Sequence, residues 1–106
     1  MRISDRYRMV FDAVSGHLAR MRQAEQEKTA GVLDCIANAV SELRAQLETV
    51  GEIPQIKLEQ RLAPILLSVH ALLDRARVLL EADGCNDDAA AIWELEQQIY
   101  RLLNDL

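Results

Sequence analysis

Apolar positions are densest between Leu62 and Leu80, in the segment LAPILLSVHALLDRARVLL. At about 100° per residue, one broad face of a helix there carries most of the aliphatic side chains. Those residues are Leu58, Leu62, Ile65, Leu66, Val69, Leu73, Ala76 and Leu80. The opposite side is also apolar, at Leu67, Ala71 and Val78. A helix with one solvent-exposed face is polar on that face, whereas this segment is apolar on both sides. The pattern therefore predicts a helix at the centre of the core.

Two further apolar stripes with three- and four-residue spacing precede this segment. The first comprises Tyr7, Phe11, Val14, Leu18 and Met21, and the second comprises Leu33, Ile36, Val40, Leu43, Leu47 and Val50. We therefore expect helices over about 5–27 and 30–50. The phase of the stripes also allows one unbroken helix of about 69 Å, which this chain could not cover alone. A turn near Thr29 and Gly31 instead allows a compact bundle, and we favour that turn.

Glycine and proline mark the remaining helix boundaries. Gly51 and Pro54 suit a loop followed by a helix start, and Gly84 suits a helix end, which predicts a third helix over 54–83 with a kink near Pro64. A fourth helix is expected over 87–105, and its core stripe is Ile92, Leu95, Ile99, Leu102, Leu103 and Leu106. The sequence thus predicts an all-α fold, an antiparallel bundle of three to four helices in a single domain, 1–106.

Composition limits the class of protein. With 106 residues, of which 50% are hydrophobic and 27% charged, the chain can bury a core of its own. The longest uncharged run, 62–73, is too short to span a membrane, and the start lacks an apolar secretory segment, so we expect a cytoplasmic protein. The two cysteines have no metal-site or redox-pair spacing. Ten arginines against two lysines, with abundant alanine, indicate a GC-rich bacterial genome.

The usual marks of catalysis are absent from the sequence, which predicts a protein that is not an enzyme and uses no cofactor or metal. A first alternative function would use His70. It opens the segment HALLDRA, which is faintly similar to the motif of histidine phosphotransfer domains, namely histidine, any residue, leucine, lysine and glycine. Leu73 and Asp74 occupy the lysine and glycine positions, and an acidic residue there is unfavourable beside a phosphohistidine.

Charge is distributed unevenly along the chain. The net charge of −5 argues against non-specific binding of nucleic acid by the whole domain. Residues 1–22 nevertheless carry a local charge of +3, from five arginines against two aspartates. A basic N-terminal arm of Arg2, Arg6 and Arg8 is therefore a second alternative, in which an oligomer binds nucleic acid.

The fourth helix carries an aromatic edge. Trp93 and Tyr100 are seven residues apart and lie about 80–100° from the stripe of Ile92 and Ile99. Such an edge either packs on a neighbouring helix or forms an interface, since tryptophan and tyrosine are enriched where partners bind.

The apolar back of the third helix, at Leu67, Ala71 and Val78, also needs cover, which a second subunit could provide. We therefore predict a homodimeric interaction module that binds an unidentified protein partner. Adaptors, chaperones, inhibitors and regulators all include small bundles of this kind.

Overall fold

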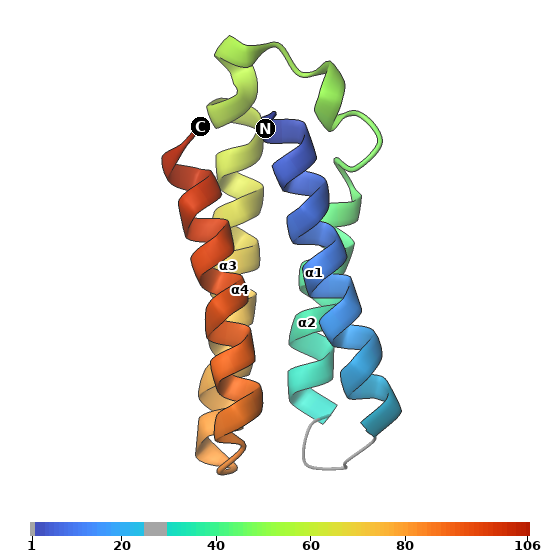
Figure 1. Ribbon diagram of the computed structural model, residues 1–106, viewed down its shortest axis with the longest axis vertical. Coiled ribbons are helices and arrows are strands. Elements are labelled where there is room, and N and C mark those ends of the chain that lie inside the picture. The colour runs from blue at the N-terminus through green and yellow to red at the C-terminus, as the bar shows by residue number, and fades with distance from the viewer. Residues whose placement is uncertain (1, 25–29) are drawn as a thin grey trace.

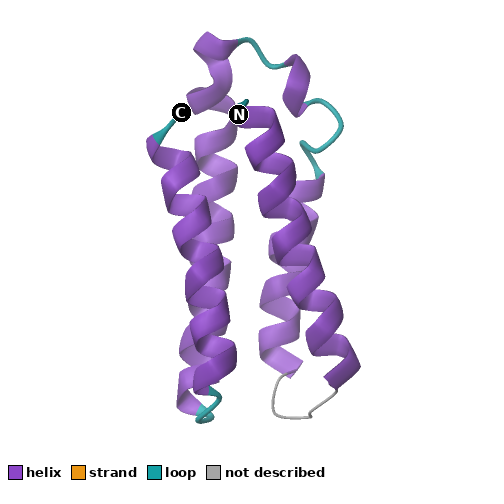
Figure 2. Cartoon of the chain, viewed as in Figure 1, coloured by secondary structure: helices purple, strands orange, loops and turns teal. Residues whose placement is uncertain are grey.

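Four helices pack side by side in an antiparallel bundle. The computed structural model describes residues 2–24 and 30–106, and no strand occurs among them. The helices are α1 (Ile3–Ala24), α2 (Ala30–Arg44), α3 (Leu58–Ala82) and α4 (Asn86–Asn104) (Figures 1 and 2). The bundle measures 43 × 22 × 20 Å. No helix in the described part of the chain combines the length and apolar character needed to cross a bilayer.

The helices form a closed ring of neighbours. Each helix contacts the next in sequence, and α4 also contacts α1. Both chain ends lie at the same end of the bundle (Figure 1), where Arg6 Nη1 donates a hydrogen bond of 2.6 Å to Asp105 Oδ2. Since α1 and α2 lie antiparallel, the single long helix that the phase allowed is wrong.

The predicted turn near Thr29 and Gly31 lies partly outside the described residues. Thr29 lies outside the described residues, as do positions 25–27 of the predicted first helix, and Gly31 lies inside α2. The start of α1 at Ile3 is two residues earlier than predicted.

The core lies along the axis of the bundle and is built from the predicted stripes. In α3 the buried residues recur every three or four positions, as expected, at Leu62, Leu66, Val69, Leu73, Ala76 and Leu80. The corresponding buried stripe of α4 comprises Ala89, Ile92, Leu95, Glu96, Ile99 and Leu102. α3 packs against α2 and α4, just as each other helix of the ring packs against two neighbours, and its opposite side is exposed at Leu67 and Val78. The prediction of a helix at the centre of the core, covered on all sides, is therefore wrong.

The predicted end of the second helix at residue 50 is wrong, because α2 ends at Arg44. Just beyond Arg44, two backbone hydrogen bonds join residues three apart instead of four. The Gln46 amide donates to the Leu43 carbonyl, and the Leu47 amide donates to the Arg44 carbonyl. The Tyr7 hydroxyl also donates a hydrogen bond of 2.7 Å to the Leu43 carbonyl. The carbonyls of Leu43 and Arg44 are therefore satisfied without a further α-helical turn.

The predicted start of the third helix at Pro54 is also wrong. Two short 3₁₀ helices, η2 (Val50–Glu52) and η3 (Gln55–Lys57), precede α3, which begins at Leu58. Pro54 is the residue before η3, and its carbonyl accepts a hydrogen bond from the Lys57 amide. Pro64 lies inside α3, which continues through this proline as one helix from Leu58 to Ala82.

Gly84 ends the long helix, as its sequence position predicted. Its φ of 76° lies in the left-handed region that glycine adopts without strain. The Gly84 amide donates to the Glu81 carbonyl, and the Cys85 amide donates to the Leu80 carbonyl. These two hydrogen bonds form a Schellman motif, which turns the chain directly into α4. The α4 bounds differ by one residue at each end from the predicted 87–105.

Candidate functional site

The five residues predicted to form an interaction surface all lie exposed on two neighbouring helices. On α3, Leu67 is 60% exposed, Val78 is 51% exposed and Ala71 is exposed. On α4, Trp93 is 48% exposed and Tyr100 is 55% exposed. The aromatic edge therefore does not pack into the core of this chain. We call the surface formed by these five residues the α3–α4 outer face.

Helical phase shows that the two halves of this face adjoin. Leu67, Ala71 and Val78 lie within about 40° of one another around α3 and about 160° from its buried stripe. On α4, Trp93 and Tyr100 lie about 40–60° from Glu96, whose carboxylate contacts α3. The aromatic side chains therefore border α3.

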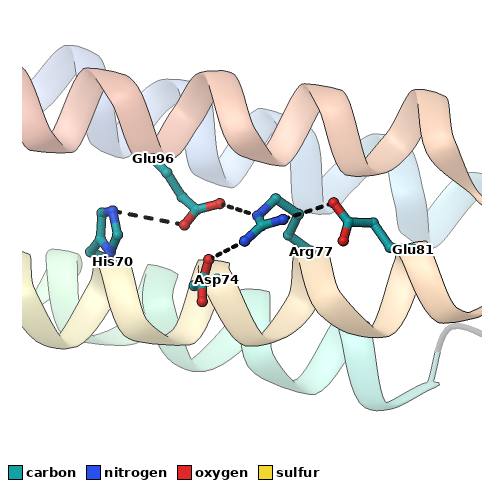
Figure 3. Close-up of polar contacts among 5 residues, drawn as sticks. All are labelled: His70, Asp74, Arg77, Glu81 and Glu96. Carbon is teal, nitrogen blue, oxygen red and sulfur yellow. Dashed lines mark hydrogen bonds and ion pairs between the residues drawn. The ribbon is translucent and has the colours of Figure 1, made fainter.

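Between the two helices lies a cluster of charged and polar side chains (Figure 3). Arg77 is its hub: its Nε donates to Glu96 Oε2 at 3.1 Å, its Nη1 to Glu81 Oε1 at 2.7 Å, and its Nη2 to Asp74 Oδ1 at 2.6 Å. His70 Nε2 lies 3.7 Å from Glu96 Oε1, which is too long for a hydrogen bond. The Arg77 guanidinium thus joins three carboxylates and ties α4 to α3.

Burial and hydrogen bonds shift the pKa values of three members of this cluster. Glu96 is only 2% exposed, and burial, with the neighbouring carboxylate of Asp74 as the next cause, raises its pKa to about 7. The hydrogen bond from Arg77 lowers the pKa of Asp74 below its ordinary range. Hydrogen bonds to Asp74 and Glu81 raise the pKa of Arg77 above its ordinary value. Near neutral pH, Glu96 therefore exchanges a proton while Asp74 stays ionised.

The surroundings of His70 do not suit phosphotransfer. Its imidazole faces the Glu96 carboxylate, and Asp74 lies one helical turn further along α3. A phosphoryl group on His70 would place about two negative charges beside these two acidic residues. The acidic residue that replaces the glycine of the motif is thus joined by a second one, from α4.

The three arginines of the predicted N-terminal arm do not form one free basic patch. Arg6 is paired with Asp105 at 2.6 Å, and Arg8 lies 3.7 Å from Asp5. Arg2 is exposed and lines a surface hollow of about 370 Å³ with Ser4 and Gly51. These residues therefore lie apart from the α3–α4 outer face, at the end of the bundle where the chain begins.

The sequence patterns did not lead us to predict this charged cluster, although the spacing of its residues contains a signal for it. Glu96 lies four residues after Ile92 and three before Ile99, which places a carboxylate inside the core stripe of α4. Asp74, Arg77 and Glu81 are spaced three and four residues apart on α3, as in helical ion pairs. Within residues 2–24 and 30–106, no group of histidine, cysteine and acidic side chains could hold a metal ion.

No protein-family model matches this chain, and comparisons with curated proteins and with solved structures found no match.

Proposed function

We propose that this protein is an interaction module that binds another protein chain through the α3–α4 outer face. The observation that carries the proposal is the exposure of four large apolar side chains, Leu67, Val78, Trp93 and Tyr100, on two adjacent helices. Exposed apolar side chains that gather on adjacent helices mark binding sites, and tryptophan and tyrosine are the residues that contribute most to binding energy. The role is one of binding rather than catalysis.

The geometry also supports binding to a preorganised surface, one that is already ordered before the partner binds. The hydrogen bond from Arg77 to Glu96 joins α3 to α4 beside the aromatic edge, so the face loses little conformational entropy when a partner binds. Trp93 and Tyr100 supply the apolar contact area, and the exposed charged residues around them set the orientation of the partner. We expect the partner to present helices to this face, because the face itself consists of two helices that lie side by side.

The test is affinity capture from a lysate of the source cell with three versions of the protein. The double variant Trp93→Ala, Tyr100→Ala removes the aromatic edge. The control Met9→Ala, Ile56→Ala removes two apolar side chains that are also exposed but lie outside the face. We expect a protein retained by the wild type and the control to be lost by the aromatic variant, with all three giving the same helical circular dichroism. Equal retention by all three versions would contradict the proposal.

We place this proposed interaction in the cytoplasm. Cys35 and Cys85 are free thiols, and Cys35 is buried. Unpaired cysteines are typical of proteins that work in a reducing compartment.

A further inference from the structure

We infer that the occupant of the α3–α4 outer face is a second copy of this chain, related to the first by a two-fold axis perpendicular to the helices. In this arrangement α3 packs antiparallel to the partner's α3, and α4 packs antiparallel to the partner's α4. The inference rests on the proposed function, since it names the partner that this same face binds. Its support is the symmetry of apolar positions along both helices and of charged positions along α4.

The first observation is the spacing of two residue pairs along α4. Trp93 and Tyr100 are seven residues apart, and so are the exposed residues Glu94 and Arg101. When a helix packs antiparallel to its own copy, each residue meets the one at equal distance beyond the midpoint. Trp93 therefore meets the partner's Tyr100, and Glu94 meets the partner's Arg101. The two midpoints differ by one residue, or about 1.5 Å along the helix.

The second observation is the placement of these pairs around α4. Trp93 and Tyr100 lie within about 20° of each other on the side that borders α3, and Glu94 and Arg101 lie about 100° away on the other side. A two-fold axis perpendicular to the helices brings like edges together. The aromatic pair thus meets an aromatic pair, and each acidic residue meets a basic one. Gln97, between the two edges, meets its own counterpart, with which an amide can exchange hydrogen bonds.

The third observation comes from α3 and is independent of the first two. Leu67 and Val78 are exposed on the same side, and their midpoint lies between residues 72 and 73. The contacts of Glu96 with His70 and Arg77 place residues 73 and 74 of α3 at the height of Glu96 on α4. One axis therefore serves both helices, and it brings Leu67 onto the partner's Val78. The dimer then covers an apolar surface that would otherwise be exposed to solvent.

The charged pair gives a sharp test, because Glu94 and Arg101 are two turns apart and do not contact each other within one chain. Either Glu94→Arg or Arg101→Glu places like charges opposite each other twice in the dimer. The chain that carries both changes restores opposite charges, and so does an equal mixture of the two single variants. Asp34→Arg and Arg22→Glu are matched controls, since both residues are exposed on α1 or α2.

The measurement is analytical ultracentrifugation over a concentration series at low salt. We expect the wild type and both controls to dimerise, each single reversal to raise the dimer dissociation constant roughly tenfold or more, and the double variant and the mixture to return close to the wild type. Single reversals without effect would overturn the inference. Rescue of Glu94→Arg by Arg75→Glu rather than by Arg101→Glu would also overturn it, because an axis parallel to the helices brings Glu94 near the partner's Arg75.

Failure of the dimer and failure of the proposed function give different results. A wild-type protein that stays monomeric at every concentration overturns the dimer. If the monomer still captures another protein that the Trp93→Ala, Tyr100→Ala variant loses, the face binds a different chain. If capture does not depend on these two residues either, the proposed function fails as well.

Discussion

Glu96 shows how a single side chain can couple the packing of two helices to pH. Its carboxylate is buried in the stripe of α4 that otherwise holds alanine, leucine and isoleucine, and it accepts a hydrogen bond from Arg77 on α3. Desolvation disfavours the ionised form, and the positive charge of Arg77 only partly offsets this cost. The carboxyl group is therefore protonated more readily in the folded chain than in the unfolded one.

We predict that ionisation of Glu96 lowers stability as pH rises. Its pKa is about 7 in the folded protein against an ordinary value of 4.5, so the folded state binds more protons between these values. The stabilisation is complete below about pH 4.5 and is lost as pH rises through 7, by up to about 3 kcal/mol at about 1.4 kcal/mol per pKa unit. Urea unfolding of the wild type and Glu96→Gln at several pH values measures this loss.

The comparison with Glu96→Gln is needed because another buried group acts in the opposite direction. Burial lowers the pKa of His17 below 6.5, so its contribution is present above that pH and is lost as the pH falls. Since both proteins contain His17, its effect cancels in the difference between them. Wild-type and variant curves that stay parallel across the pH range would show that Glu96 is not the group responsible.

At the scale of helices, the sequence is a reliable guide to stripes and a weaker guide to ends. The buried residues of α3 could be predicted because apolar spacing reports which face is covered. The end of α2 could not be predicted, because the Tyr7 hydroxyl that bonds to the Leu43 carbonyl comes from another helix. Likewise, helical phase placed Trp93 and Tyr100 beside the core stripe, but only the packing of α3 on α4 shows that they are exposed.

We predict that Gly84→Ala destabilises the protein by about 1–2 kcal/mol. The φ of 76° at Gly84 strains any residue with a Cβ atom, and no atom of residues 2–24 and 30–106 lies within 4 Å of a Cβ added there. The cost is therefore one of backbone conformation, free of any steric clash. Thermal unfolding monitored by circular dichroism should show a lower midpoint with unchanged helix content at low temperature. Gly16→Ala, inside α1 and with a negative φ, is the matched control and should not lower the midpoint.

At the scale of the whole molecule, we expect the stability of the fold to depend on the buried side of α3 more than on its exposed side. Leu66 and Leu73 are fully buried, so Leu66→Ala or Leu73→Ala should each lower the free energy of unfolding by about 2–5 kcal/mol. Denaturant unfolding at a protein concentration low enough to exclude a dimer provides the measurement. Leu67→Ala, on the exposed side of the same helix, should cost less than about 1 kcal/mol there. Similar losses at all three positions would mean that α3 is covered on both sides.

The ring of helices makes the chain suitable for circular permutation. Because α4 contacts α1, and α1 starts at the end of the bundle where α4 finishes, a short linker could join residue 106 to the first residues of α1 without crossing the bundle. New ends could then be opened at Gly84, where the chain is exposed. Such a circular permutant keeps every helix pair, interrupts the turn at Gly84 and changes the order in which the helices are synthesised. The packing of this bundle is thus separable from the order of its helices along the chain.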